Sequence, residues 1–244
     1  MRGVSIKKLA IAITAVGALT GSALAADMPV KARPVAPVVT TYNWTGCYVG
    51  AGGGYGMYNQ DVSGASGEVQ QVMGSGSETL GGRGWFGTGQ VGCDYQVTPS
   101  IVIGAFGDYD FGSIKGHLGD VDEKLSWSWA TGGRIGWVAL PNLLAYVSGG
   151  YTEAHFDQID FAPGYAYFPA TTYHGWFLGS GYEYGLSFMP GLFWKTEYRF
   201  ADYQTETLFE VCVVGKDCES NASLDSHKYV QTIRSALVYR FNWH

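Results

Sequence analysis

Alternation of apolar and polar residues, with a period of two, is the feature that most limits the folds available to this chain. Residues 190–200 show it clearly, because Trp194 and Tyr198 fall on one side of an extended chain and Lys195 and Glu197 on the other. Successive side chains of a β-strand point to opposite faces of a sheet. The pattern therefore predicts a strand with one apolar face and one charged face.

The same alternation recurs after residue 44, and the spacing of an amphipathic helix does not. It predicts eight strands, at residues 45–57, 84–97, 101–112, 125–139, 143–155, 174–186, 190–200 and 229–241. Short connections near 97–100, 140–142 and 187–190 alternate with long ones near 58–82, 113–124, 156–173 and 204–227. We therefore predict an all-β fold, an eight-stranded antiparallel transmembrane β-barrel with four long external loops and short periplasmic turns.

The direction of the apolar face distinguishes two kinds of barrel. An outer-membrane barrel turns its apolar residues toward lipid, whereas a soluble lipocalin-like barrel turns them inward. In residues 125–139, Leu125, Trp127 and Trp137 share the apolar face, and aromatic residues of this kind suit the two membrane interfaces. Charged residues make up 15% of the chain, against roughly 25% in ordinary soluble domains, which is too few to cover a solvated exterior.

The charged residues of the predicted strands form a balanced set on the opposite face. Because an unpaired buried charge is costly, a self-neutralising set is what a packed lumen requires. The expected lumen network consists of the acids Asp94, Asp108, Asp110, Glu183 and Glu197 and the bases Arg134, Lys195, Arg199, Arg234 and Arg240.

The first 43 residues precede the predicted barrel. Residues 1–25 have a basic start, an apolar stretch and a small-residue cleavage site, which predicts a secretory signal peptide; an uncleaved anchor is the alternative. Residues 26–43 are rich in proline and are predicted to be a periplasmic linker, either a plain spacer or a contact for an anionic partner. Residues 44–244 are predicted to form the outer-membrane barrel. No basic stripe suggests nucleic acid as a partner.

The four cysteines favour disulfides, because the periplasm is oxidising. Cys212 and Cys218 lie in the last long connection, and a local bond between them is the preferred pairing. Cys47 and Cys93 lie at neighbouring ends of the first two strands, where either a cross-strand bond or two free thiols would fit. The sequence does not choose among the pairings that four cysteines allow.

Catalytic, cofactor and metal sites are not predicted. His155, His174 and His227 lie at or near the ends of long connections, where some membrane barrels carry catalytic residues. Polar residues of the barrel rim are the simpler interpretation. The cysteine and histidine spacings match no zinc motif.

Several stretches resemble a known family. Residues 233–241 resemble the last strand of outer-membrane barrels, whose final aromatic is read by the barrel assembly machinery; here that aromatic is Phe241 or Trp243. Residues 44–50 resemble the first strand of small alphaproteobacterial outer-membrane proteins, often labelled outer-membrane immunogenic or porin-family proteins. Residues 107–111, 132–137 and 195–198 resemble further strands. The resemblance covers about residues 44 to 241 and the proline-rich lead-in, and it implies an eight-stranded barrel without catalytic residues.

Two functions are compatible with such a barrel. The first is a structural role in the cell outer membrane, with surface-exposed, immunogenic loops and a packed charged lumen. The alternative is a small porin-like channel, although eight strands enclose an interior just wide enough for side chains. Outer-membrane lipid and lipopolysaccharide are the expected partners. Acidic residues of the connections suggest weak cation-mediated contact with lipopolysaccharide, or simply a solvated surface: Asp61, Glu68, Glu78, Asp120, Asp122, Glu123, Glu206, Glu210 and Asp217.

Overall fold

The computed structural model describes residues 42–63, 78–118, 121–162, 166–212 and 223–241. The predicted signal peptide, nearly all of the predicted linker, and Trp243 lie outside the described residues.

Within the described residues, no helix is long and apolar enough to cross a membrane.

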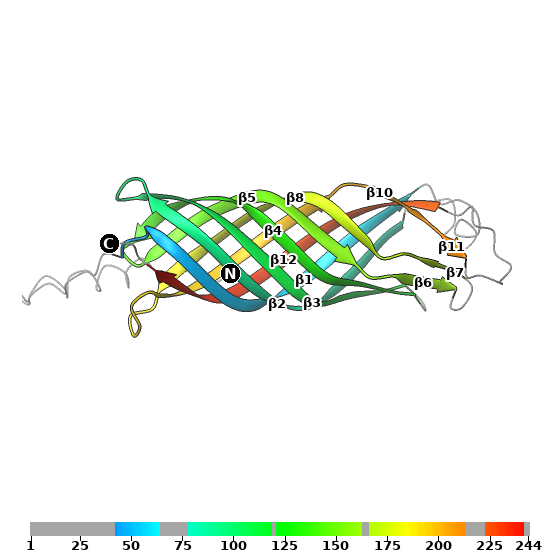
Figure 1. Ribbon diagram of the computed structural model, residues 1–244, viewed down its shortest axis with the longest axis horizontal. Coiled ribbons are helices and arrows are strands. Elements are labelled where there is room, and N and C mark those ends of the chain that lie inside the picture. Colours follow the sequence, from blue (N-terminus) through cyan, green and yellow to red (C-terminus); the bar gives the residue numbers. More distant parts are fainter. Residues whose placement is uncertain (1–41, 64–77, 119–120, 163–165, 213–222, 242–244) are drawn as a thin grey trace, which may run out of the picture. The chain divides into compact units, whose positions relative to one another are not determined.

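The described chain folds into antiparallel strands that close on themselves (Figure 1). A nine-stranded sheet has the order β1-β2-β3-β4-β5-β8-β9-β12-β10, and β1 also pairs with β12, so that eight strands form the closed wall and β10 adds to its rim. A three-stranded sheet has the order β11-β7-β6. The strands are β1 (Gly46–Ser63), β2 (Glu78–Gln96), β3 (Ile101–Leu118), β4 (Val121–Leu140), β5 (Leu143–Phe156), β6 (Ile159–Ala162), β7 (Ala166–Phe168), β8 (Thr171–Gly185), β9 (Leu192–Tyr203), β10 (Glu206–Phe209), β11 (Val211–Cys212) and β12 (Ser223–Phe241).

The eight predicted strands are confirmed, but several extend further at the end with the long connections. β3 and β4 run through most of 113–124, and the short strands β6, β7, β10 and β11 occupy parts of 156–173 and 204–227. Figure 1 shows these short strands together at one end of the barrel. In β3 the register to β4 shifts between Phe111 and Ile114. A fixed period of two does not continue through such a bulge, which is why the predicted strand ended there.

The predicted facing of Leu125 was wrong, because the strand pairing is irregular beside it. The sequence placed Leu125 on the outer apolar face with Trp127, but its side chain is buried inside the barrel. The pairing of β4 with β5 shifts between Leu125 and Trp127, so the two residues no longer share a face. A one-residue change of phase moves a side chain to the opposite side of the sheet.

The outer wall of the barrel is apolar. Trp85, Ile135, Trp137 and Leu178 are each at least 60% exposed, whereas the charged lumen residues of the same strands, Asp94, Arg134 and Glu183, are buried. Water would be a poor solvent for a continuous apolar band of this size, and lipid would be a good one. This arrangement excludes the lipocalin-like alternative.

Glycine makes room for large rings inside the barrel. Phe86 and Gly54 are paired residues of β2 and β1, and a Cβ on Gly54 would lie 2.6 Å from the Phe86 ring. Tyr48 and Gly92 are paired in the same way, and a Cβ on Gly92 would lie 2.5 Å from the Tyr48 hydroxyl. Since interiors are close-packed, each of these rings requires a neighbour without a side chain.

We predict that Gly54→Ala destabilises the folded barrel and that Gly89→Ala does not. The first substitution overpacks the Phe86 ring and the β12 backbone, at a cost of about 1–3 kcal/mol. Gly89 belongs to the neighbouring strand and has open space where its Cβ would lie, so its substitution should change stability by less than about 0.5 kcal/mol. Urea unfolding in lipid vesicles measures both, and equal midpoints for the two variants would contradict the packing of rings on glycine.

Candidate functional site

Four charged residues form a closed ring of hydrogen bonds toward the end of the lumen with the short turns. Arg134 donates from Nε to Asp94 (2.9 Å) and from Nη1 to Glu183 (2.5 Å). Arg240 donates to the same two carboxylates, over 2.6 Å to Asp94 and 2.9 Å to Glu183. Each carboxylate therefore lies between two guanidinium groups, and the formal charges of the ring cancel.

A second cluster lies further along the lumen. Arg199 donates two hydrogen bonds to Asp108, over 2.9 and 2.7 Å, and a third to Glu197 over 2.9 Å. Arg234 bridges Asp108 and Asp110, over 3.2 and 2.9 Å. Bidentate guanidinium–carboxylate bonds of this kind fix both the position and the orientation of the groups.

Lys195 supplies the cation that the second cluster lacks. Its ammonium donates to Gln90 over 2.6 Å and lies 3.8 Å from the Glu197 carboxylate. The Tyr146 hydroxyl donates to the same carboxylate over 2.9 Å. All ten charged residues that the sequence assigned to the lumen are buried in the described barrel.

A third cluster surrounds Lys228, which the sequence prediction missed. Lys228 is fully buried and donates to Glu123 (2.5 Å) and to Gln60 (2.6 Å). Its ammonium also lies over the rings of Phe156 and Tyr173, 4.1 and 5.0 Å from their centroids. Cation–π contacts are stronger where water is excluded.

The prediction for Glu123 was wrong. The sequence placed it in an acidic external connection, but β4 begins before it and its side chain is buried beside Lys228. Counting backward in steps of two from Arg234 and Thr232 would have reached Lys228. The predicted strand began at residue 229, one residue after Lys228, whereas β12 begins at Ser223.

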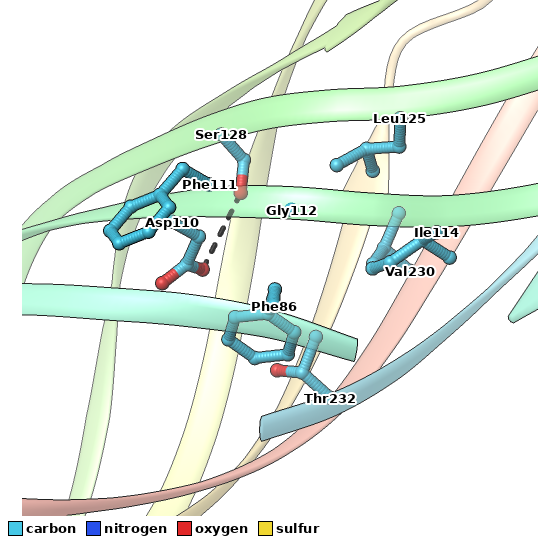
Figure 2. A pocket seen from close by; sticks show the side chains of 9 residues that line it. All are labelled: Phe86, Asp110, Phe111, Gly112, Ile114, Leu125, Ser128, Val230 and Thr232. Carbon is cyan, nitrogen blue, oxygen red and sulfur yellow. Dashed lines mark hydrogen bonds between the residues drawn. The ribbon is translucent and has the colours of Figure 1, made fainter. Parts of the chain in front are cut away.

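A small cavity lies between Asp110 of the second cluster and a group of apolar side chains (Figure 2). Its volume is about 10 Å³, close to the least that holds one water molecule. Asp110 and Ser128 lie on one side of it, joined by a hydrogen bond of 3.4 Å, and Ile114, Leu125 and Val230 lie on the other. Apolar side chains therefore border the second cluster across this cavity.

Trp44 fills the lumen at the end with the short turns. It is fully buried, its ring lies 5.0 Å from that of Phe193, and its carbonyl oxygen accepts a hydrogen bond of 2.9 Å from Arg240. Trp44 precedes the first predicted strand, so alternation did not place it in the lumen.

Some hydrogen bonds of these clusters run from one side of the barrel to the opposite side. β3 and β9 are four strands apart around the wall, as are β4 and β12, so each pair stands on opposite sides of the barrel. The bonds of Arg199 to Asp108 join the first pair, and the bond of Lys228 to Glu123 joins the second. Side-chain hydrogen bonds thus cross the lumen at more than one level.

Cys47 and Cys93 lie on the outer side of the barrel wall. Cys47 and Cys93 are paired residues of β1 and β2 and form a disulfide. Cys212 is also disulfide-bonded, and its expected partner Cys218 lies outside the described residues. Phe241 pairs with Cys47 across the seam between β12 and β1.

The three histidines near the long connections, His155, His174 and His227, lie on the outer wall and contact aromatic or polar neighbours. His155 stacks on Trp127, and His174 lies 2.8 Å from the Tyr151 hydroxyl. His227 lies 2.8 Å from Asp202. The described residues contain no group of three or more His, Cys, Asp or Glu side chains that could hold a metal ion.

Comparison with known proteins relates the chain to outer-membrane proteins. No protein-family model matches the sequence. The 31 kDa outer-membrane immunogenic protein of Brucella melitensis is 31% identical over 237 residues, which cover 90% of this chain and 94% of that protein. The 22 kDa outer membrane protein of Rhizobium leguminosarum is 28% identical over 174 residues, which cover 70% of each chain.

Among solved structures, the outer membrane protein OprG from Pseudomonas aeruginosa matches with a TM-score of 0.51 at 11% identity. The match covers 81% of this chain and 97% of that one. At this level of identity the likeness shows the fold alone.

We predict that Arg134→Met strongly destabilises the barrel. It leaves Asp94 and Glu183 buried with one of their two guanidinium partners, at an expected cost of about 3–5 kcal/mol. Lys124→Met is the matched control, because its salt bridge to Asp157 is partly exposed, with side chains 37% and 42% accessible, and should contribute about 0–1 kcal/mol. Urea unfolding curves of the two variants in the same lipid provide the comparison. A cost for Arg134→Met no larger than that of the control would show that the ring contributes little to stability.

Proposed function

We propose, for a chain that belongs to the alphaproteobacterial family of outer-membrane immunogenic proteins, that its barrel is a closed structural element of the envelope. The protein is an outer-membrane β-barrel protein, as the names of its relatives and its fold indicate. In the proposed role the wall is anchored in lipid, and the end with the long connections is exposed at the cell surface.

The observation that carries the proposal is the set of hydrogen bonds that cross the lumen. Arg199 with Asp108, and Lys228 with Glu123, join opposite walls at two levels. A water-filled conduit requires an interior wider than the side chains that line it. Bonds across the full width of the barrel favour a solid interior that stiffens the wall.

The partners in this proposal are chemically simple. The exposed apolar wall would contact the hydrocarbon of the outer membrane, and the polar end would contact lipopolysaccharide. Surface exposure and an immunogenic role are inferred from the name of the Brucella relatives. We further propose that Phe241 is the aromatic read by the assembly machinery, because it ends β12 and points outward with 51% of its surface exposed.

The proposal includes no catalytic step. His174 and His227 have carboxylate neighbours, but both pairs lie on the outer wall beside aromatic rings. That setting suits a membrane interface, where amphipathic rings collect. The porin-like alternative has no comparable observation in its favour and is distinguished by conductance.

We predict that purified folded protein produces no stable, uniform channels in a planar lipid bilayer, because side chains block the lumen at several levels. Folding is verified first, by the shift in gel mobility that heating causes in a stable membrane barrel, so that a silent bilayer is not mistaken for unfolded protein. A large porin measured in the same bilayers is the positive control. Reproducible unit conductance from the folded protein would defeat the closed-barrel proposal in favour of the channel.

A further inference from the structure

We propose that the Cys47–Cys93 disulfide acts during assembly, by fixing the register of β1 on β2 before β1 meets β12. The bond joins the beginning of β1 to the end of β2, at residues that are directly paired. It is therefore compatible with one register of this strand pair. The inference concerns how the barrel is built, and it is independent of whether the finished barrel conducts.

The two joined strands have few side chains that could specify their register. Of the ten pairs from Gly50↔Gln90 to Asn59↔Gly81, eight contain a glycine. The exceptions are Tyr55 with Trp85, whose rings lie 5.1 Å apart, and Met57 with Arg83. Register is weakly specified in glycine-rich strands, which are prone to slippage.

Packing inside the barrel does not remove this ambiguity. Phe86 lies over Gly54 in the native pairing, but glycines also occur two residues away on either side, at Gly52 and Gly56. A slip of two residues keeps every side chain on its own face and still places a glycine opposite Phe86. Such a slip would lose the contact of Tyr48 with Gly92 inside the barrel and that of Tyr55 with Trp85 outside it.

An error of register at this position would affect closure of the whole barrel. β1 is the strand that closes the sheet, because it pairs with β2 on one side and with β12 on the other. Cys93, Cys47 and Phe241 lie in one row across these three strands. In a closed barrel the registers together determine the stagger, so a slip at one pair requires compensation at another.

The chemistry of the step is an ordinary thiol oxidation. The two thiols form one sulfur–sulfur bond and release two protons and two electrons, which a periplasmic disulfide-bearing oxidant accepts as it is reduced to its dithiol. Cys93 is exposed and Cys47 is partly exposed on the outer wall at the end with the short turns. An exported chain encounters such an oxidant before it inserts.

The timing of reduction tests the proposal. Urea-denatured protein is refolded into detergent or lipid with dithiothreitol present from the start, or with dithiothreitol added after folding, and the heat-modifiable fraction is measured on gels. Early reduction should lower the folded fraction several-fold, and late reduction should leave it unchanged. Equal folded fractions under both conditions would overturn the assembly role, and loss of folded protein only after late reduction would assign the bond to the stability of the finished barrel.

Variants separate this bond from the other cysteines and from a general need for cysteine. Cys47→Ser with Cys93→Ser should reproduce early reduction, whereas Cys212→Ser with Cys218→Ser should fold as the wild type does under oxidising conditions. Adding Val49→Cys and Val91→Cys to the first variant places a new bond at the next equivalent pair in the native register, and it should restore folding. Failure of this rescue would contradict a role in register.

A slipped barrel can also be detected directly. In Cys47→Ser with Val49→Cys, the native register places residue 49 opposite residue 91, away from Cys93. A disulfide between residues 49 and 93 would therefore report a slip of two residues, and peptide mapping by mass spectrometry after non-reducing digestion identifies it. We expect this slipped bond in a fraction of the molecules. Its absence, together with full folding of the variant, would show that register does not depend on the native bond.

Discussion

The interior of an eight-stranded barrel has room for side chains and little else. Every charged group that points inward must therefore find its partner among the other inward-pointing groups. In this protein the partners are found across the lumen, where Arg134 and Arg240 share Asp94 and Glu183 and where Arg199 reaches Asp108. The rest of the described structure depends on this closed set of bonds, because breaking one partner leaves a buried charge without compensation.

The same limit on space explains the composition of the chain. Large rings such as Tyr48 and Phe86 occupy the lumen beside the charges, and they fit because glycines stand opposite them on neighbouring strands. Because glycine has no side chain, the glycines leave fewer contacts that specify the register of each strand pair. The Cys47–Cys93 bond lies just beyond the glycine-rich stretch that β1 forms with β2, at the strand where the sheet must close. The limited space inside the barrel thus accounts both for the packing of rings on glycines and for the role we propose for the disulfide.

Much of the architecture could be predicted from alternation. The set of inward charges followed from the period of two, because each of them lies on a regular stretch of strand. Lys228 and Glu123 were missed because they lie where the strands run on into the predicted long connections, and Leu125 was misplaced because a bulge reverses the phase beside it. Which charges pair could not be predicted, since contact between β3 and β9, or between β4 and β12, depends on the stagger of the closed sheet. Alternation along single strands contains no information about that stagger.

The claim that charges pair across the lumen is tested most directly by solid-state nuclear magnetic resonance in lipid bilayers. Dipolar recoupling between guanidinium nitrogen and carboxylate carbon measures separations at this scale, and variants such as Arg134→Met assign the signals. The account predicts rigid, close contacts for the buried arginines, with the Arg199 contact to Asp108 lost in Arg199→Met. Mobile guanidinium groups without carboxylate contacts would show a solvated interior and would contradict the account.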